Sequence, residues 1–220
     1  MLAGIAVSAF FWARLARRDD RLLIVYVAAL IGAFLGAKLA YLFAEGWRDF
    51  GRPDMWLRLA TGKSILGALL GGYAGVELAK RWVGYRGVTG DWFAVIAPIG
   101  IILGRIGCWL HGCCLGRACE STWLTIRDAS GVERWPSVPV EILFNLAILI
   151  GFFVLRHQRR LTGQHFHLYL IAYGLFRFTH EFLRDTPRVV GPLSGYQFVA
   201  LFVAAFGMWA FRRRAASPGS

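Results

Sequence analysis

Residues 22–43 read LLIVYVAALIGAFLGAKLAYLF and contain one charged side chain, that of Lys38. Because a helix needs about 20 mostly apolar residues to cross a bilayer, this stretch predicts a transmembrane helix. Six further apolar runs predict similar helices at Leu2–Ala16, Ser64–Leu78, Trp92–Leu110, Val138–Leu155, Phe166–Phe182 and Leu193–Phe211. The sequence therefore predicts an all-α, polytopic membrane protein of about seven transmembrane helices. These helices would form one domain over residues 1–214, followed by a disordered cytoplasmic tail at residues 215–220.

The overall composition also favours a membrane protein. Hydrophobic residues make up 57% of the chain, charged residues only 17%, and the mean hydropathy is +0.51. Soluble domains contain about 25% charged residues. The net charge of +12 would suit nucleic acid, but the basic residues stand in short clusters between apolar runs and follow no stripe or binding motif. We therefore expect no nucleic-acid partner.

The basic clusters predict the orientation of the chain. They fall in alternate connections between the predicted spans, at Arg14–Arg21, Lys80–Arg86, Arg156–Arg160 and Arg212–Arg214. Connections rich in Lys and Arg remain in the cytoplasm. The N-terminus is therefore expected outside the cytoplasm and the C-terminus inside. The longer connections lie on the outer side, at Ala44–Lys63, His111–Ser137 and Arg184–Pro192, so we expect the functional site to face outward.

Glycines in the predicted spans suggest where helices pack closely. Several are separated by four residues, and the set comprises Gly32, Gly36, Gly67, Gly71, Gly72 and Gly75. Small residues at this spacing let helix backbones approach each other, so the pattern predicts close packing of helices in the bundle.

Charged residues inside the spans predict a buried polar site. A charge at the centre of a bilayer costs at least about 2.5–3.5 kcal/mol, so such residues pair, face a wet cavity or serve a function. They are Lys38, Glu77, Arg105, Glu141, Arg177 and Glu181. Arg177 and Glu181 are four residues apart and share a helix face with Tyr173. They form either a local ion pair or part of a pocket, shared with Arg105 and Glu141, in which guanidinium groups bind a phosphate.

Five sequence segments resemble a known family. Residues 104–117 read GRIGCWLHGCCLGR, residues 36–41 GAKLAY, residues 64–70 SILGALL, residues 136–141 PSVPVE and residues 173–184 YGLFRFTHEFLR. In this order, and over nearly the whole chain, they resemble the prolipoprotein diacylglyceryl transferase family. The resemblance implies an enzyme of the bacterial inner membrane with its active site toward the periplasm. Such an enzyme moves a diacylglyceryl group from phosphatidylglycerol, or another anionic phospholipid, to a cysteine thiol of a prolipoprotein, without a cofactor or a metal.

The resemblance also implies roles for individual residues. Arg105 and Arg177 would hold the phosphate, and Glu181 would orient Arg177. Further substrate-binding candidates are Gly104, Gly112, Gly116, Arg117, Glu141, Tyr173 and Lys38. The chain departs from the family pattern at three positions: the family's histidine falls on Leu66, its asparagine on Cys108 and its glutamate on Cys113.

A cluster of cysteines follows Arg105. Cys108, Cys113, Cys114 and Cys119 all lie within twelve residues, together with His111. The outer side of the membrane is oxidising, so disulfides are one interpretation, with three possible pairings. In a second, His111 is a general base and Cys108, Cys113 or Cys114 is a nucleophile, since a nearby arginine favours the thiolate. A third interpretation is a metal site, but the spacing matches no common zinc motif, and we expect none.

Two other functions are compatible with these residues. The first is a Cys/His-dependent membrane acyltransferase with a different acceptor, which would form a covalent adduct on a cysteine. The second is a non-catalytic lipid-binding or transport protein that has lost the chemistry, as the missing family histidine and asparagine would suggest.

Overall fold

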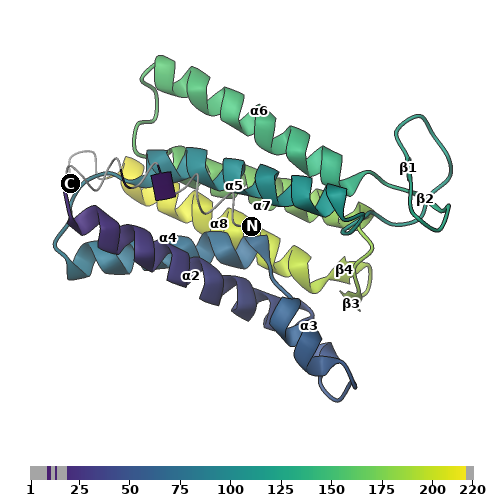
Figure 1. The fold of residues 1–220 in the computed structure, drawn as a ribbon. Coiled ribbons are helices and arrows are strands. Elements are labelled where there is room, and N and C mark those ends of the chain that lie inside the picture. Colours follow the sequence, from purple (N-terminus) through teal and green to yellow (C-terminus); the bar gives the residue numbers. More distant parts are fainter. Residues whose placement is uncertain (1–8, 11–12, 14–18, 217–220) are drawn as a thin grey trace.

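The computed structural model describes residues 9–10, 13 and 19–216, and this part of the chain is mostly helical (Figure 1). Of the predicted first span, Leu2–Ala16, only residues 9, 10 and 13 are described. Residues 217–220 of the predicted tail lie outside the described residues. The long helices are α2 (Arg21–Ala44), α4 (Ile65–Trp82), α5 (Gly90–Leu110), α6 (Ser137–His157), α7 (His165–His180) and α8 (Gly195–Ala215). Each of the other six predicted spans coincides with one of these helices.

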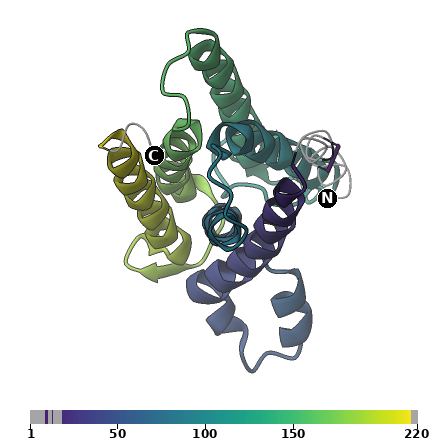
Figure 2. The same cartoon turned by 90° about the vertical axis from the view of Figure 1, so that its left-hand side faces the viewer.

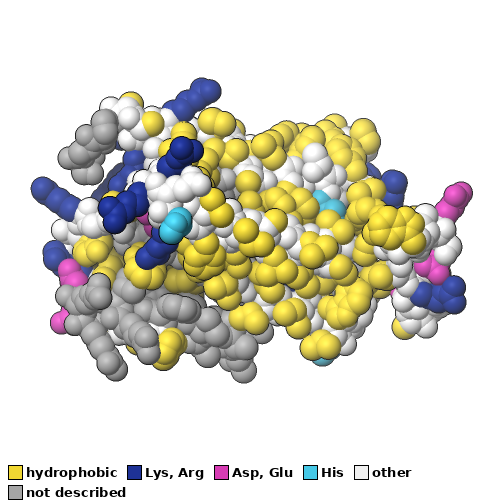
Figure 3. Space-filling view, turned by 90° about the horizontal axis from the view of Figure 1, so that it is seen from above, with side chains coloured by type: hydrophobic (Ala, Val, Ile, Leu, Met, Phe, Trp, Pro, Cys, Tyr) yellow, Lys and Arg dark blue, Asp and Glu magenta, His cyan; other side chains and the backbone are white. Residues whose placement is uncertain are grey.

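Within the described residues, α2, α5 and α6 are long and apolar enough to cross a membrane. Many large apolar side chains on the long helices are exposed, as expected for surfaces that face lipid. Examples are Leu39, Phe43, Leu143, Ile150 and Phe202. Figure 3 shows apolar side chains along the length of the molecule and charged ones at its two ends. The chain is therefore an all-α membrane protein.

The short elements gather at one end of the bundle (Figure 1). They are the 3-10 helix Gly46–Asp49, α3 (Met55–Thr61), the antiparallel pair β1 (Ile126–Arg127) and β2 (Glu133–Arg134), and the antiparallel pair β3 (Arg188–Val190) and β4 (Leu193–Ser194). These elements occupy the three long connections that the sequence predicted to be outside the cytoplasm, except β4, which takes the first two residues of the predicted span Leu193–Phe211. The basic cluster Arg212–Arg214 lies at the opposite end, in the last turn of α8.

The pair α2 and α4 packs backbone against backbone. A Cβ atom added to Gly32 or Gly36 would lie 2.3 Å from the carbonyl oxygen of Gly71 or Gly67, and one added to Gly71 would lie 2.1 Å from the oxygen of Gly32. Distances this short exclude any side chain. The predicted close approach is therefore confirmed for these glycines, but Gly72 has no atom nearer than 3.6 Å and does not need to be glycine.

On the other side of the bundle, α7 packs along α8, and α5 packs between α6 and α7. Figure 2 shows α6 at the side of the bundle away from α3. Long aromatic side chains of α7 reach across to α6. Phe176 stacks on Phe144 with 4.0 Å between ring centroids, and the hydroxyl of Tyr169 donates a hydrogen bond to Asn145 Oδ1 at 2.9 Å. The spacing between α6 and α7 is therefore set by these side chains and not by contact between the two backbones.

Replacing Gly71 with alanine should lower stability, because the new methyl group would collide with the backbone of α2. Overpacking of this kind costs about 1–3 kcal/mol. Gly72→Ala is the matched control, since its methyl group meets only ordinary van der Waals contacts and alanine favours the helix. Thermal unfolding of the two purified variants in detergent tests this. Equal melting temperatures for both would contradict the backbone contact.

Candidate active site

Glu141 links the three helices α5, α6 and α7. It is the fifth residue of α6, just after the first turn, and its side chain is 0% exposed. Nη2 of Arg105, on α5, lies 2.8 Å from Oε2 and 3.1 Å from Oε1 of Glu141. The hydroxyl of Tyr173, on α7, donates a hydrogen bond to Oε1 at 2.7 Å. Burial of the carboxylate is compensated because a cation and a hydroxyl donor both reach it.

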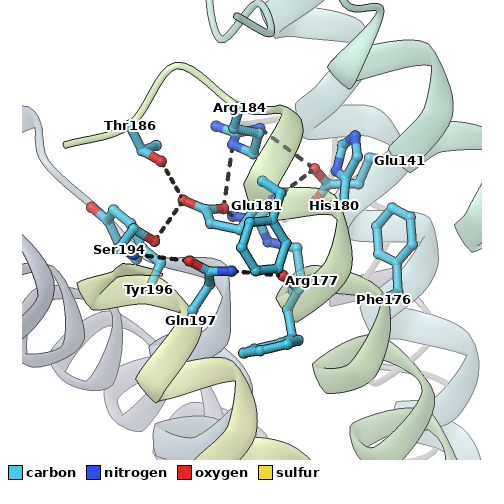
Figure 4. A network of polar contacts seen from close by, with 12 residues as sticks. Glu141, Phe176, Arg177, His180, Glu181, Arg184, Thr186, Ser194, Tyr196 and Gln197 are labelled. Atoms are coloured by element: carbon cyan, nitrogen blue, oxygen red, sulfur yellow. Dashed lines mark hydrogen bonds and ion pairs between the residues drawn. The ribbon is translucent and has the colours of Figure 1, made fainter. Parts of the chain in front are cut away.

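Glu181 forms a second buried carboxylate centre beside the first (Figure 4). Nη2 of Arg177 donates to its Oε2 at 2.7 Å, and Nε of Arg184 lies 3.7 Å from the same oxygen. The hydroxyls of Thr186 and Ser194 donate to Oε1 at 2.8 and 3.3 Å. Arg177 and Arg184 also each come within 3.9 Å of Glu141 Oε2, so the two centres are one network.

The network carries a net positive charge. Arg105, Arg177 and Arg184 face two carboxylates, which leaves one positive charge among these five side chains. Burial, followed by the charges of Arg177 and Arg105, lowers the pKa of Arg184, although a guanidinium remains protonated at neutral pH. Buried nitrogen atoms of all three arginines have no hydrogen-bond acceptor within the described residues. An anion is the ligand that would both balance the positive charge and accept hydrogen bonds from these nitrogen atoms.

All three arginines line one cavity of about 1570 Å³. Its walls come from α2, α4, α5, α7 and α8 and are mostly apolar, and they extend to Arg213 and Arg214 at the far end of α8. The cavity is larger than the about 300–1,000 Å³ that is usual for small-ligand pockets. An apolar cavity with basic side chains at both ends, and with the cluster of Arg105, Arg177 and Arg184 at one of them, has the form expected for an anionic lipid.

Three of the four cysteines meet beside Arg105. The Sγ atoms of Cys108, Cys113 and Cys114 lie within 4.8 Å of one another. Cys108 and Cys114 line the cavity with Arg105. A hydrogen bond from Cys108, together with the charge of Arg105, lowers the pKa of Cys114 to about 5, while partial removal from water opposes this shift. All four cysteines are free thiols, and Cys119 lies apart from this group.

Comparison with known proteins identifies the family of the chain. The model of the prolipoprotein diacylglyceryl transferase family matches residues 1–213. The chain belongs to this family. It is 31% identical over 206 residues to a phosphatidylglycerol–prolipoprotein diacylglyceryl transferase of Clostridium tetani, covering 88% of this chain and 80% of the relative. It is also 32% identical over 192 residues to a protein of the same name from Geobacter sulfurreducens, covering 82% and 72%. The chain is therefore a transferase.

The structure of this transferase brings together five of the residues that the sequence predicted. Arg105, Glu141, Tyr173, Arg177 and Glu181 form the network described above. The ion pair of Arg177 with Glu181 exists, as the simpler alternative proposed, but Arg177 also approaches Glu141 and lines the cavity. Local neutralisation is thus only part of its role.

Glycines of the signature segment have different surroundings. Gly104 lines the cavity, and its position for a Cβ atom is open. Gly112 is exposed with φ +62°, so it permits the turn after α5. Gly116 is buried, and a Cβ atom there would lie 2.5 Å from the carbonyl oxygen of Trp135. Gly112 and Gly116 therefore shape the loop, and the described cavity wall includes neither of them.

Three other candidates lie away from the described cavity wall. Nζ of Lys38 donates to the carbonyl oxygens of Leu59 and Ala60, at 2.7 and 2.5 Å, and so binds the end of α3. Arg117 is exposed, and its backbone joins the loop to Leu183 and Trp135. His111 is exposed at the end of α5 and is not part of the cluster of Cys108, Cys113 and Cys114. The structure thus gives Lys38 and Arg117 partners within the protein and places His111 outside the cysteine cluster, and the roles of these three residues toward substrate stay predictions.

Two residues of this region, the partly buried Arg184 and the buried His180, were not among the predicted site residues. Arg184 lies three residues after Glu181 and seven after Arg177, so helical spacing could have placed it on the same face. His180 accepts a hydrogen bond from Trp135 Nε1 at 3.2 Å through its Nε2 atom and stacks on Phe176. Its role is to position α7 against the loop that precedes α6.

Replacing Glu141 with glutamine should strongly destabilise the bundle. Glutamine keeps an acceptor for Tyr173 but removes the charge that three arginines face, and breaking a buried ion pair costs about 3–5 kcal/mol. Glu77→Gln is the control, because Glu77 is partly exposed and lies 3.4 Å from Lys80, a pair worth about 0–1 kcal/mol. Thermal unfolding in detergent measures both. A Glu141→Gln protein as stable as the control would refute the central role of this carboxylate.

Proposed function

We propose that this transferase moves a diacylglyceryl group from phosphatidylglycerol to a cysteine thiol of a prolipoprotein. The observation that carries the proposal is the cluster of Arg105, Arg177 and Arg184, with one net positive charge, at one end of a large apolar cavity. The printed names of its relatives state this reaction for those proteins. In this chain the acyl chains would lie in the apolar part of the cavity and the phosphate at the arginines.

The chemistry of the reaction suits this arrangement. The acceptor loses its thiol proton, and the thiolate attacks the glyceryl carbon that carries the phosphate. The carbon–sulfur bond forms as the carbon–oxygen bond breaks, and its electron pair leaves with glycerol phosphate, which gains one negative charge. Guanidinium groups fixed in a site shielded from water stabilise this developing charge without having to reorganise. Glu141 and Glu181 hold the guanidinium groups in place before the lipid binds.

We further propose seven transmembrane helices, with the N-terminus in the periplasm, the C-terminus in the cytoplasm and the active site toward the periplasm of the inner membrane. Three features support this orientation. Successive long helices alternate in direction (Figure 1), the arginine cluster shares its end with α3 and the two strand pairs, and Arg212–Arg214 lie at the other end. Basic residues favour the cytoplasmic side.

Replacing Arg177 with lysine should reduce transfer by about 10²–10³-fold, because lysine retains the charge that balances Glu181 but loses the planar fork that binds two phosphate oxygens. The assay follows label from phosphatidylglycerol to a cysteine-containing lipoprotein peptide, at lipid concentrations that saturate the enzyme. Arg86→Lys, at an exposed residue between α4 and α5, should retain full transfer. A folded Arg177→Lys protein with unchanged transfer would exclude the phosphate-binding role.

Reporter fusions test the orientation. Alkaline phosphatase, which requires the periplasm, should be active when inserted in the turn between β1 and β2. A fluorescent protein that matures in the cytoplasm should fluoresce when fused after residue 220. The reverse result would overturn the proposed orientation, and a second phosphatase insertion in the connection between α6 and α7 should be inactive.

A further inference from the structure

Three thiols converge from a short segment of chain. Cys108 lies in the last turn of α5, while Cys113 and Cys114 follow the end of that helix. The backbone N–H of Cys113 bonds to the carbonyl oxygen of Cys108 at 3.0 Å, and φ is +62° at both Gly112 and Cys114. These two left-handed residues turn the chain back on itself. The turn brings all three Sγ atoms within 4.8 Å of one another.

The spacing of the sulfur atoms is close to that of a metal centre. Sulfur ligands in a tetrahedral zinc site are about 2.3 Å from the ion, which places them about 3.8 Å apart. The three thiols would need to move together by only about 1 Å at most to reach this geometry. Thiolates select soft ions such as Zn²⁺ and Cu⁺ over hard ones.

A covalent intermediate on one of these cysteines is chemically unfavourable for the proposed reaction. If a cysteine of the enzyme attacked the glyceryl carbon, the product would be a thioether. Transfer to the acceptor would then need a thiolate to leave from carbon, whereas the first step expels a phosphate ester. A disulfide, in turn, would use two of the thiols and leave the third without a function.

We propose that Cys108, Cys113 and Cys114 bind one thiophilic metal ion, most simply Zn²⁺, and that this centre receives the acceptor thiol. The cavity reaches Cys108 and Cys114 on the same wall as Arg105. Catalytic zinc sites have three protein ligands and an open fourth position. The sequence spacing alone argued against a zinc motif, but the spatial arrangement of the three sulfur atoms supports one.

The role in catalysis rests on the proposed function. The acceptor cysteine occupies the fourth position and releases its proton to water, because a thiol that coordinates a metal ion is deprotonated. Its sulfur then attacks the glyceryl carbon of a lipid whose phosphate is held at Arg105. The carbon–oxygen bond breaks, and glycerol phosphate takes the electron pair. The centre thus supplies the acceptor thiolate that attacks the glyceryl carbon.

Metal binding by the full-length protein tests the site directly. The protein is purified in detergent with a reductant, exchanged into reductant-free buffer under argon, and titrated with Co²⁺ as a probe, whose thiolate complexes absorb visible and near-ultraviolet light. We expect about one ion per chain and its displacement by Zn²⁺. Cys108→Ser, Cys113→Ser and Cys114→Ser should each weaken binding by more than the about 10–100-fold cost of losing a residue that only supports a ligand.

Cys119→Ser is the matched control, because this cysteine lies in the same loop but outside the thiol group, and it should bind the probe as the unmodified protein does. Equal loss of binding in Cys119→Ser, or no thiolate absorption in the unmodified protein, would overturn the site. The site would also be overturned if mass spectrometry detects a disulfide among Cys108, Cys113 and Cys114 in protein purified from membranes without reductant.

Transfer assays separate this inference from the proposed function. Dialysis against a chelator should lower transfer at least tenfold, and Zn²⁺ should restore it, while the chelator leaves Cys114→Ser at its already reduced rate. If the chelator has no effect on an active enzyme, the metal role fails and the transferase function stands. If the ion binds but phosphatidylglycerol is never consumed, the proposed reaction fails and the metal site stands.

Discussion

The arrangement of the site depends on the burial of one carboxylate, that of Glu141, between three helices. A charge in the hydrocarbon region is tolerated only when partners reach it, and Glu141 obtains its partners from α5 and α7. The same carboxylate comes within 3.9 Å of Arg177 and Arg184. Because every one of these groups would be unstable alone, the requirement for mutual neutralisation brings α5, α6 and α7 together at this site.

The charges of this network do not cancel completely, and the remaining positive charge determines what the site can bind. Two carboxylates orient three guanidinium groups, so the cluster is rigid before any ligand binds and still retains one positive charge. A cluster with equal charges would have little affinity for a phosphate. A cluster without carboxylates would be unstable in the apolar cavity, because its three cations would repel one another.

Much of the fold could be predicted because a membrane imposes simple rules. Apolar runs located the six long helices of the described chain, and the charges inside them identified Arg105, Glu141, Arg177 and Glu181 as one network. The short strands and α3 could not be predicted, because local hydrogen bonds such as those of Asp128 in the β1–β2 turn form them, without an apolar pattern. The partners of Lys38 could not be predicted for a related reason: they are backbone carbonyl groups, which leave no signal in the sequence. The cluster of three cysteine thiols depends on left-handed backbone at Gly112 and Cys114, and the spacing of the cysteines in the sequence does not predict that turn.

The contact between α2 and α4 has a consequence for how the enzyme must move. Side chains can change rotamer and let helices slide, but the paired backbones at Gly32, Gly36, Gly67 and Gly71 have nothing that can rearrange. The two helices therefore behave as one rigid unit along one wall of the cavity. Any widening that admits a lipid tail, or releases a lipidated product into the bilayer, has to come from the other walls of the cavity, which α5, α7 and α8 form.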